Sequence, residues 1–379
     1  MKVAEYIGIF GTGGIEHVVL QLFQHINHQK FDIDFVIDFW QEVACEEEIY
    51  SNNGRIRSIF PAAGEVTKAY QKVLKAWHFY RLLKKEKYDI VHMHLSYPST
   101  LLYCFIAKLA GVRVRVVQSH ASNYGDIGRV YRKISELARK FFLPSATHLL
   151  AVSHEAGKWM FGNRKYDILS NGIEVDKFTY SESDREHLRK HYNLDEETLV
   201  IGHVGRFSFA KNHEFLVDIY KEILKKQSNA MLLLIGEGIL KEDIVRRIEQ
   251  LGIRDKVLMV PFTSSVAQYY QMMDAFVFPS RYEGFGIAAL EAQVSGLPVW
   301  ISNEVPKEVE LTDNIYSLSL DKTAEEWANN IMERLKKFVR RDCLAAIENK
   351  GIDIKEKSKW LENYYLTMSK GSCGRIDAI

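Results

Sequence analysis

Residues 200–226 read VIGHVGRFSFAKNHEFLVDIYKEILKK, an apolar run followed by a longer periodic segment. The run 200–204 predicts a short buried strand, and 213–226 has the apolar spacing of a helix. The loop between them carries two basic residues, Arg206 and Lys211. A strand, a loop and a helix in this order form half of a βαβ unit, whose strands are parallel.

The same alternation extends to both sides of this stretch. Further strands are predicted at 3–10, 31–38, 90–94, 114–120, 148–153, 230–236, 256–261, 275–279 and 298–302. Helices are predicted at 16–28, 68–87, 99–109, 241–251, 265–272, 286–295 and 355–368. The pattern predicts an α/β protein with two consecutive doubly wound, Rossmann-like parallel sheets facing a cleft.

The chain length and one polar segment suggest where the domains divide. A chain of 379 residues suits two domains, at about 100–200 residues each. Residues 181–197 are charge-rich with weak periodicity, so we place a linker near 171–183. We predict a first domain at 1–178, joined by the helix at 355–370, and a second domain at 179–354.

Composition excludes several function classes. The net charge is +1, which gives no global attraction to nucleic acid. The four cysteines form no CxxC or Cys/His cluster, so neither a zinc site nor a disulfide framework is expected. The start of the chain has the pattern of a strand rather than a signal peptide, and no apolar run is long enough to span a bilayer. We therefore expect a cytoplasmic protein.

Ligands of open parallel sheets bind at the carboxyl ends of the strands, so the loops there are the first places to search. The first such loop contains Gly13 and Gly14, which allow close approach of a ligand to the backbone before a helix N-terminus. The spacing is not GxGxxG, and a tight turn without a ligand is the alternative.

The loop after strand 200–204 contains Gly205, Arg206 and Lys211. A guanidinium and an ammonium fixed at a strand end can hold a diphosphate. The alternative is two solvated basic side chains, but their position in the predicted sheet favours ligand binding.

Residues 283–291 read EGFGIAALE and follow another predicted strand. Gly284 and Gly286 bring the backbone close to a ligand, and the helix that follows offers free N–H groups. The carboxylates of Glu283 and Glu291 can accept hydrogen bonds from paired sugar hydroxyls. A helix-dipole role would explain one glutamate in the first turn, but not this pair.

Histidines end two strands of the first domain. His120 follows the strand 114–118 and is a candidate for a role at the cleft, with a structural hydrogen bond as the alternative. His92 and His94 form a pair that could hold a metal, but the sequence offers no evident third ligand, so we predict no metal site.

Basic and aromatic residues are interleaved at 68–87 and 129–142. Helices of this kind can lie on anionic membrane surfaces, which makes a peripheral membrane contact one interpretation. A solvated helix face with its aromatic rings in the core is the other.

Together these motifs resemble the retaining glycosyltransferases of family 4, also called glycosyltransferase group 1, whose fold is GT-B. Within the family the chain is similar to the bacterial capsular and exopolysaccharide group. The matching residues are Gly13–Glu16, His120, Asn171–Ile173 with Asp176 and Phe178, Val204–Arg206 with Lys211 and Asn212, and Glu283–Glu291. The last stretch has the ExxxxxxxE spacing of the family.

The resemblance implies roles in the second domain. Arg206 and Lys211, beside Gly205, would bind the donor diphosphate and stabilise the leaving group. Glu291 would hold the ribose, and Glu283 would face the transferred sugar. The other donor-binding residues that it implies are Gly284, Phe285, Gly286 and Ile287.

The resemblance also implies roles in the first domain and at the base. His120 would approach the sugar, and Gly13 and Gly14 would place N–H groups near phosphate or acceptor. Many relatives have a glycine in the base-binding loop where this chain has Pro261 and Phe262, which leaves UDP or GDP open, with UDP favoured. The final helix would cross back onto the first domain.

For the reaction, the resemblance implies transfer of a hexose-type sugar with retention, without a metal or other cofactor. The acceptor would be a hydroxyl of a saccharide or lipid-linked saccharide, at the inner face of the membrane if the enzyme contacts it. Front-face attack is our hypothesis, and a covalent carboxylate intermediate is the competing mechanism. The alternative functions are a GT-B epimerase or phosphorylase and a non-catalytic sugar-nucleotide-binding subunit.

Overall fold

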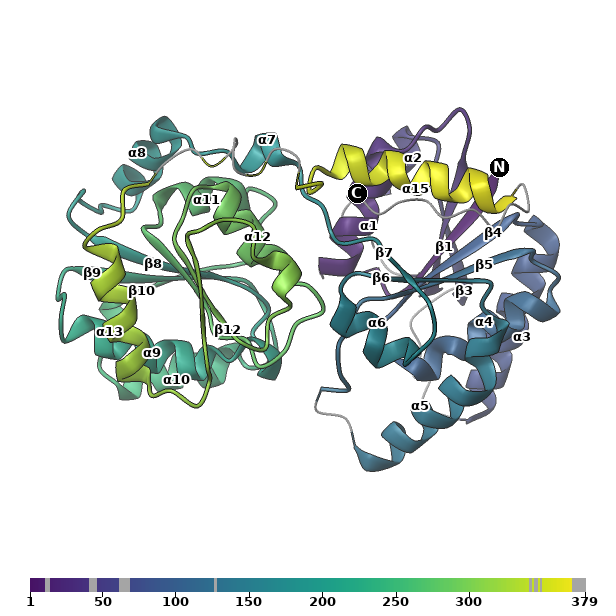
Figure 1. Cartoon of the computed structure of the whole chain (residues 1–379), viewed down its shortest axis with the longest axis horizontal. Helices are drawn as coiled ribbons and strands as arrows, with labels where there is room; N and C mark the ends of the chain where they lie inside the picture. The colour runs from purple at the N-terminus through teal and green to yellow at the C-terminus, as the bar shows by residue number, and fades with distance from the viewer. Residues whose placement is uncertain are drawn as a thin grey trace. The chain divides into compact units, whose positions relative to one another are not determined.

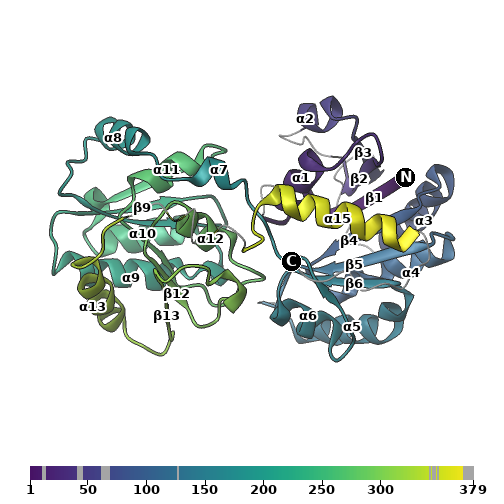
Figure 2. The same cartoon turned by 45° about the horizontal axis from the view of Figure 1, so that its top comes forward.

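The structure, a computed structural model, describes residues 1–10, 14–40, 46–60, 69–125, 128–340, 343, 347 and 350–369. The chain forms two compact units. Unit 1 comprises Met1–Gly172 and Asp353–Ile379, and unit 2 comprises Ile173–Ile352. Each unit has a parallel sheet with helices on both faces (Figures 1 and 2).

The sheet of unit 1 has seven strands in the order β3-β2-β1-β4-β5-β6-β7. They are β1 (Lys2–Gly8), β2 (Asp32–Phe39), β3 (Arg55–Phe60), β4 (Ile90–Leu95), β5 (Val114–Ser119), β6 (His148–Ala151) and β7 (Asp167–Ile168). The helices between them are α1 (Gly14–His25), α2 (Glu46–Ser51), α3 (Ala69–Glu86), α4 (Leu102–Leu109), α5 (Arg129–Phe142) and α6 (His154–Phe161).

The sheet of unit 2 has six strands in the order β10-β9-β8-β11-β12-β13. They are β8 (Leu199–Val204), β9 (Ala230–Ile235), β10 (Val257–Val260), β11 (Ala275–Phe278), β12 (Val299–Ser302) and β13 (Ile315–Leu318). The helices are α7 (Val175–Phe178), α8 (Glu182–His191), α9 (His213–Leu224), α10 (Lys241–Gln250), α11 (Val266–Met272), α12 (Ile287–Val294) and α13 (Ala324–Leu335).

The central strands are buried on both faces, which explains why they have continuous apolar runs instead of alternating ones. All four residues of β11 are buried, as are all four of β12. In unit 2 the core is completed by large side chains from the helices, among them Tyr220 and Trp327. The predicted α/β class with two doubly wound sheets is confirmed.

The strand order reverses at one point in each sheet. In unit 1 this point lies between β1 and β4, and in unit 2 it lies between β8 and β11. Loops at the carboxyl ends of these strands leave in opposite directions, and the gap between them is the usual ligand site of an open parallel sheet. The loops after β8 and β11 contain Lys211 and Glu283.

Helix α15 (Ile354–Ser369) returns to unit 1 and contacts α1 (Figures 1 and 2). It buries Trp360, Leu361 and Tyr365. The Ser358 hydroxyl donates to the carbonyl of Leu22 at 3.1 Å. The predicted return of the final helix to the first domain is therefore found.

The division between the units lies at Gly172, whereas the sequence analysis placed it after residue 178. The difference arises from the short helix α7, which contacts α11 and α12 of unit 2. Phe178 is buried, and its ring lies 5.9 Å from that of Tyr270. Among the described residues, no helix is long and apolar enough to cross a bilayer.

Candidate active site

In unit 2, side-chain and backbone contacts join the loop after β8 to the loop after β11. Lys211 Nζ lies 2.7 Å from Glu283 Oε1 and 4.5 Å from the ring centre of Phe278. Asn212 Nδ2 donates to the Pro279 carbonyl at 3.1 Å, and the Arg281 N–H donates to the Ala210 carbonyl at 2.7 Å. The fold therefore brings together a cation and a carboxylate that are 72 residues apart.

Two glycines that the sequence analysis did not assign fix the backbone next to Arg206. Gly236 has φ +143°, and a Cβ there would lie 2.3 Å from the Gly205 carbonyl oxygen. Gly238 has φ +157°, and its Cβ would lie 2.4 Å from the Phe207 carbonyl oxygen. The GxG pattern directly after β9 was the signal that could have identified this contact.

Arg206 is exposed at the end of β8. Within the described part of the chain, its guanidinium makes no hydrogen bond or ion pair. It is therefore available to an anion, unlike Lys211, whose ammonium is paired with Glu283.

Glu291 lies in the interior, on helix α12, and is 6% exposed. The Tyr270 hydroxyl donates to its Oε2 at 2.8 Å. Burial raises the pKa of Glu291 to about 7, against the opposing effects of the Tyr270 hydroxyl and the Lys211 charge. A carboxyl with this pKa can change its charge when a ligand changes its surroundings.

The remaining predicted donor-binding residues of unit 2 differ in exposure. Phe262 is 54% exposed after β10, and Pro261 beside it is exposed too. Phe285 is buried, whereas Gly284 and Ile287 are half-buried. Gly286 precedes α12 with φ +105°, a conformation that favours glycine.

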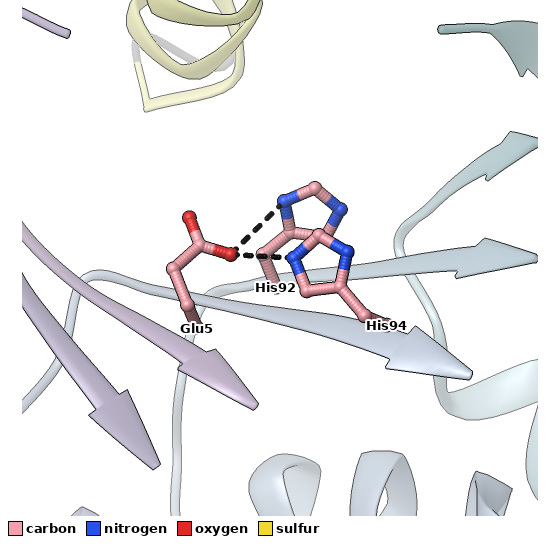
Figure 3. A group of neighbouring side chains, drawn as sticks. All are labelled: Glu5, His92 and His94. Carbon is pink, nitrogen blue, oxygen red and sulfur yellow. Dashed lines mark hydrogen bonds and ion pairs between the residues drawn. The ribbon is translucent and has the colours of Figure 1, made fainter. Parts of the chain in front are cut away.

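In unit 1, Gly14 is the exposed first residue of α1, and Gly13 lies outside the described residues. His120 follows β5 and is 8% exposed. Its Nε2 lies 3.0 Å from His94 Nδ1, and His94 Nε2 lies 2.8 Å from Glu5 Oε2. Figure 3 shows Glu5 pointing at both His92 and His94.

Glu5 supplies the third group near the histidine pair that the sequence did not reveal. Ligand atoms of Glu5, His92 and His94 all lie within 4.8 Å of one another. Both ring nitrogens of His94 and both oxygens of Glu5 take part in hydrogen bonds, so these two side chains are satisfied by protein partners. The absence of a metal stays a prediction.

Comparison with known proteins identifies the family that has this architecture. Residues 12–177 match the model for Glycosyltransferase Family 4, and residues 184–347 match the model for glycosyl transferases group 1. The chain is a GT-B glycosyltransferase of family 4.

Several curated proteins are similar to this glycosyltransferase along much of their length. The putative glycosyltransferase EpsF of Bacillus subtilis is 28% identical over 96% of each chain. A UDP-Gal:alpha-D-GlcNAc-diphosphoundecaprenol alpha-1,3-galactosyltransferase of Escherichia coli is 26% identical over 76% of each. The capsular polysaccharide biosynthesis glycosyltransferase CapH of Staphylococcus aureus is 25% identical over 76% of this chain and 80% of its own.

Among solved structures, Anabaena HepE in complex with UDP and glucose has a TM-score of 0.78 with this glycosyltransferase. It is 17% identical, over 97% of this chain and 100% of its own. At this identity the likeness concerns the fold.

The glycosyltransferase thus brings several of its predicted site residues together within unit 2. Lys211, Glu283 and the carboxyl of Glu291 share one end of the sheet, and the Lys211 charge acts on Glu291. Sequence reasoning missed Tyr270 and Glu5, because a tyrosine in a helix and a single acid in a strand have no motif of their own. Their roles depend on which side chains face them.

Proposed function

We propose that this glycosyltransferase transfers a hexose-type sugar from UDP-sugar to a hydroxyl of a saccharide or lipid-linked saccharide during synthesis of a cell-surface polysaccharide. The observation that carries the proposal is the Lys211–Glu283 pair, at 2.7 Å, at the strand-order switch of unit 2. The choice of UDP is supported by the names of relatives and of solved structures, which include a UDP-galactose enzyme and a complex with UDP and glucose.

The chemistry needs positive charge where the departing diphosphate becomes negative. Preorganised cations at that point lower the barrier. Arg206 is unpaired among the described residues, and Lys211 can exchange Glu283 for a phosphate oxygen. Glu283, released from Lys211, is then able to accept hydrogen bonds from the sugar hydroxyls.

The remaining residues that the sequence analysis singled out also have roles in the proposed reaction. Ionised Glu291 accepts hydrogen bonds from both ribose hydroxyls, and its Tyr270 partner orients it. His120 of unit 1 contacts the transferred sugar. The backbone of Gly13 and Gly14 serves phosphate or acceptor, and Pro261 and Phe262 lie beside the base.

We propose that the reaction proceeds with retention, by attack of the acceptor on the face from which diphosphate leaves. The leaving phosphate oxygen takes the acceptor proton, so no separate base is needed. The two basic side chains stand in for the divalent metal that other transferases use. An EDTA-treated enzyme should keep its activity, and loss of turnover restored by Mg²⁺ or Mn²⁺ would contradict the metal-free reaction.

The donor is tested by thermal shift with UDP, GDP and ADP, each alone and as the glucose conjugate. We expect UDP compounds to give the largest stabilisation. UDP release should then require a saccharide acceptor. Binding without turnover on any acceptor would favour a non-catalytic subunit, and formation of an epimeric UDP-sugar or a sugar phosphate would favour an epimerase or a phosphorylase.

Helix α5 supports a peripheral contact with the membrane. Four of its apolar side chains face outwards, at spacings of four, three and four residues: Val130 is 74% exposed, Ile134 51%, Leu137 56% and Phe141 64%. The buried face is formed by small residues such as Ser135 and Ala138. A helix that exposes its large apolar side chains and buries its small ones marks an interaction surface.

We propose an anionic lipid surface at the cytoplasmic face as the partner of α5, because the helix is basic. The helix has five basic residues and one acidic residue, RVYRKISELARKFF. The acidic one, Glu136, pairs with Arg139. A second copy of the chain would place like charges together, whereas anionic lipid attracts them.

The membrane contact is tested by co-sedimentation with phosphatidylcholine vesicles, with and without phosphatidylglycerol. We expect binding to anionic vesicles only, weakened by salt and abolished in Leu137→Gln/Phe141→Gln. Ile239→Gln, at a 92% exposed apolar residue of unit 2, is the matched control and should bind normally. Equal binding by both variants, or no binding by the native protein, would contradict the contact.

A further inference from the structure

A continuous chain of buried hydrogen bonds runs from the C-terminal helix to His120. The Tyr365 hydroxyl on α15 lies 2.8 Å from Glu5 Oε1 on β1. Glu5 Oε2 lies 2.8 Å from His94 Nε2 on β4, and His94 Nδ1 lies 3.0 Å from His120 Nε2 after β5. These four side chains are each at most 8% exposed. They connect residues 365 and 120 through neighbouring strands of one sheet.

The sheet register explains why these side chains meet. Glu5 pairs with His92 across β1 and β4, and His94 pairs with Gln118 across β4 and β5. Side chains two residues apart on a strand share a face, so Glu5, His92, His94 and His120 lie on one side of the sheet. Helix α15 places Tyr365 on the same side, where its hydroxyl also lies 2.6 Å from His92 Nδ1.

Burial favours the neutral form of all three imidazoles. Burial lowers the pKa of His92 and of His94 to about 3, and it lowers the pKa of His120 well below its usual range. Each ring therefore has one N–H donor and one bare nitrogen acceptor. Burial raises the pKa of Glu5, while His92 and the Tyr365 hydroxyl act in the opposite direction.

An ionised Glu5 fixes the direction of every bond in this chain. An ionised Glu5 accepts from Tyr365 and from the Nε2–H of His94. His94 Nδ1 is then bare and must accept from the Nε2–H of His120. In that state Nδ1 of His120 has a lone pair. A protonated Glu5 that donates to His94 would reverse both imidazoles and turn Nδ1 of His120 into a donor.

We propose that Glu5, His94 and Tyr365 are positioning residues that hold His120 as its Nε2–H tautomer, so that Nδ1 accepts a hydrogen bond from a substrate hydroxyl. This role rests on the proposed function of His120. An ion held by Glu5, His92 and His94 is the competing interpretation, because an ion there would replace the Glu5–His94 hydrogen bond.

The tautomer is tested without any activity measurement. In protein with ¹⁵N-labelled histidine, long-range proton–nitrogen correlation spectra distinguish a protonated from a bare ring nitrogen. We expect His120, assigned with His120→Gln, to carry its proton on Nε2. A proton on Nδ1 in the native protein would overturn the proposal, and so would a stoichiometric metal in the purified full-length protein.

The second test measures kcat as a function of pH. Tyr365→Phe removes a donor that lowers the pKa of Glu5, so the acidic limb of the kcat profile should move to higher pH. The groups facing Glu5 are His92 and His94 from β4 and Tyr365 from α15. Tyr364→Phe, which removes the adjacent hydroxyl that faces Asp167 at 3.4 Å, is the control and should leave the limb in place.

Glu5→Gln should lower kcat by about 10–100-fold, as loss of an orienting partner does in other sites, with a smaller change in the KM for donor. Equal pH profiles for the native protein, Tyr365→Phe and Tyr364→Phe would overturn the proposal. If Glu5→Gln fails to fold, the tautomer of His120 and the pH profile of kcat for Tyr365→Phe still test the proposal. A His120→Gln enzyme with native activity would instead remove His120 from the proposed function, whatever tautomer the spectra show.

Discussion

At the scale of single residues, Glu291 is a buried carboxyl whose charge changes near neutral pH. Burial raises its pKa to about 7, so the carboxyl is largely protonated below pH 7 and ionised above it. Only the ionised form has no proton on either oxygen, which suits the proposed contact with two ribose hydroxyls. Under that proposal, the affinity of the protein for nucleotide rises with pH, whereas the contribution of the carboxyl to stability falls.

We expect the Kd for UDP, measured by calorimetry, to rise as the pH falls from 8 to 6. Glu291→Gln should bind UDP more weakly at pH 8 and lose most of this pH dependence. Glu242→Gln, on the exposed surface of α10, is the control. A pH dependence that is the same in Glu291→Gln and in the native protein would contradict a ribose role for this carboxyl.

The stability of the ligand-free protein should show the opposite trend. The pKa of Glu291 is raised from 4.5 to about 7 on folding, so its stabilising effect is complete below about pH 4.5 and is lost as the pH rises through 7. The loss amounts to about 3 kcal/mol, at about 1.4 kcal/mol per pKa unit. Glu291→Gln should therefore make unit 2 more stable than the native protein in urea at pH 8, and a less stable variant would contradict this.

Lys211 is a residue whose removal we predict to slow the reaction severely. Lys211→Met should reduce kcat by about 10²–10³-fold, as loss of one group that stabilises developing charge does elsewhere. Lys241→Met is a matched control, because Lys241 pairs with Glu237 at 2.8 Å in the same unit. Steady-state UDP release measures both, and equal rates would remove Lys211 from the diphosphate site.

The same substitution removes the ammonium that lies 2.7 Å from Glu283 Oε1, and the Glu283 side chain is only 11% exposed. Removing one charge of a largely buried ion pair destabilises the fold, so the double variant Lys211→Met/Glu283→Gln should melt higher than Lys211→Met alone.

The sequence predicted the Lys211 and Glu283 loops because both follow apolar strands of a parallel sheet. It could not predict their 2.7 Å contact, which depends on which strands are neighbours. Glu5 was missed for the same reason. Its place beside the histidines is evident only once β1 is known to pair with β4, where Glu5 lies opposite His92.

At the scale of elements, three strands that the sequence analysis did not predict share a property: β3, β7 and β13 are all sheet edges. Edge strands are covered less completely, so they need no continuous apolar run. β3 has two buried residues in six, and β13 has none. The central strands were predicted because burial on both faces requires an unbroken apolar sequence.

The loop after β9 provides a prediction at this scale. Gly238→Ala adds a Cβ 2.4 Å from the carbonyl oxygen of Phe207, at φ +157°. We expect it to destabilise unit 2 by about 1–3 kcal/mol from backbone strain, with a further cost from the clash, and to weaken UDP binding through Arg206. Gly252→Ala, at φ +68° with nothing within 4 Å, is the control for backbone strain alone. Equal melting temperatures for the two variants would contradict the close contact.

At the scale of the whole molecule, α15 makes unit 1 discontinuous in sequence. The unit needs residues from both ends of the chain, and α15 buries Trp360, Leu361, Tyr364 and Tyr365. Fully burying one large apolar side chain contributes about 1.5–3 kcal/mol, so the helix supplies much of the stability of an ordinary domain.

Removal of residues 353–379 should therefore unfold unit 1 and leave unit 2 folded. Calorimetry should show two transitions for the full chain and one for the truncated chain, and limited proteolysis should leave a fragment near 173–352. Trp360→Ala in the full chain should lower only the transition of unit 1. An unchanged transition of unit 1 in both variants would show that α15 is dispensable for that unit.

The chain crosses between the units twice, after Gly172 and before Asp353, and the two crossings are adjacent, with Ile173 N–H donating to the Ile352 carbonyl at 3.0 Å. Residues 173–352 can therefore be exchanged as a cassette with two cuts that open no main sheet strand. A chimaera made in this way would keep its host's α15 and receive a foreign Lys211–Glu283 loop pair. Under the proposed function, donor preference should follow the parent of residues 173–352 and acceptor preference the parent of unit 1.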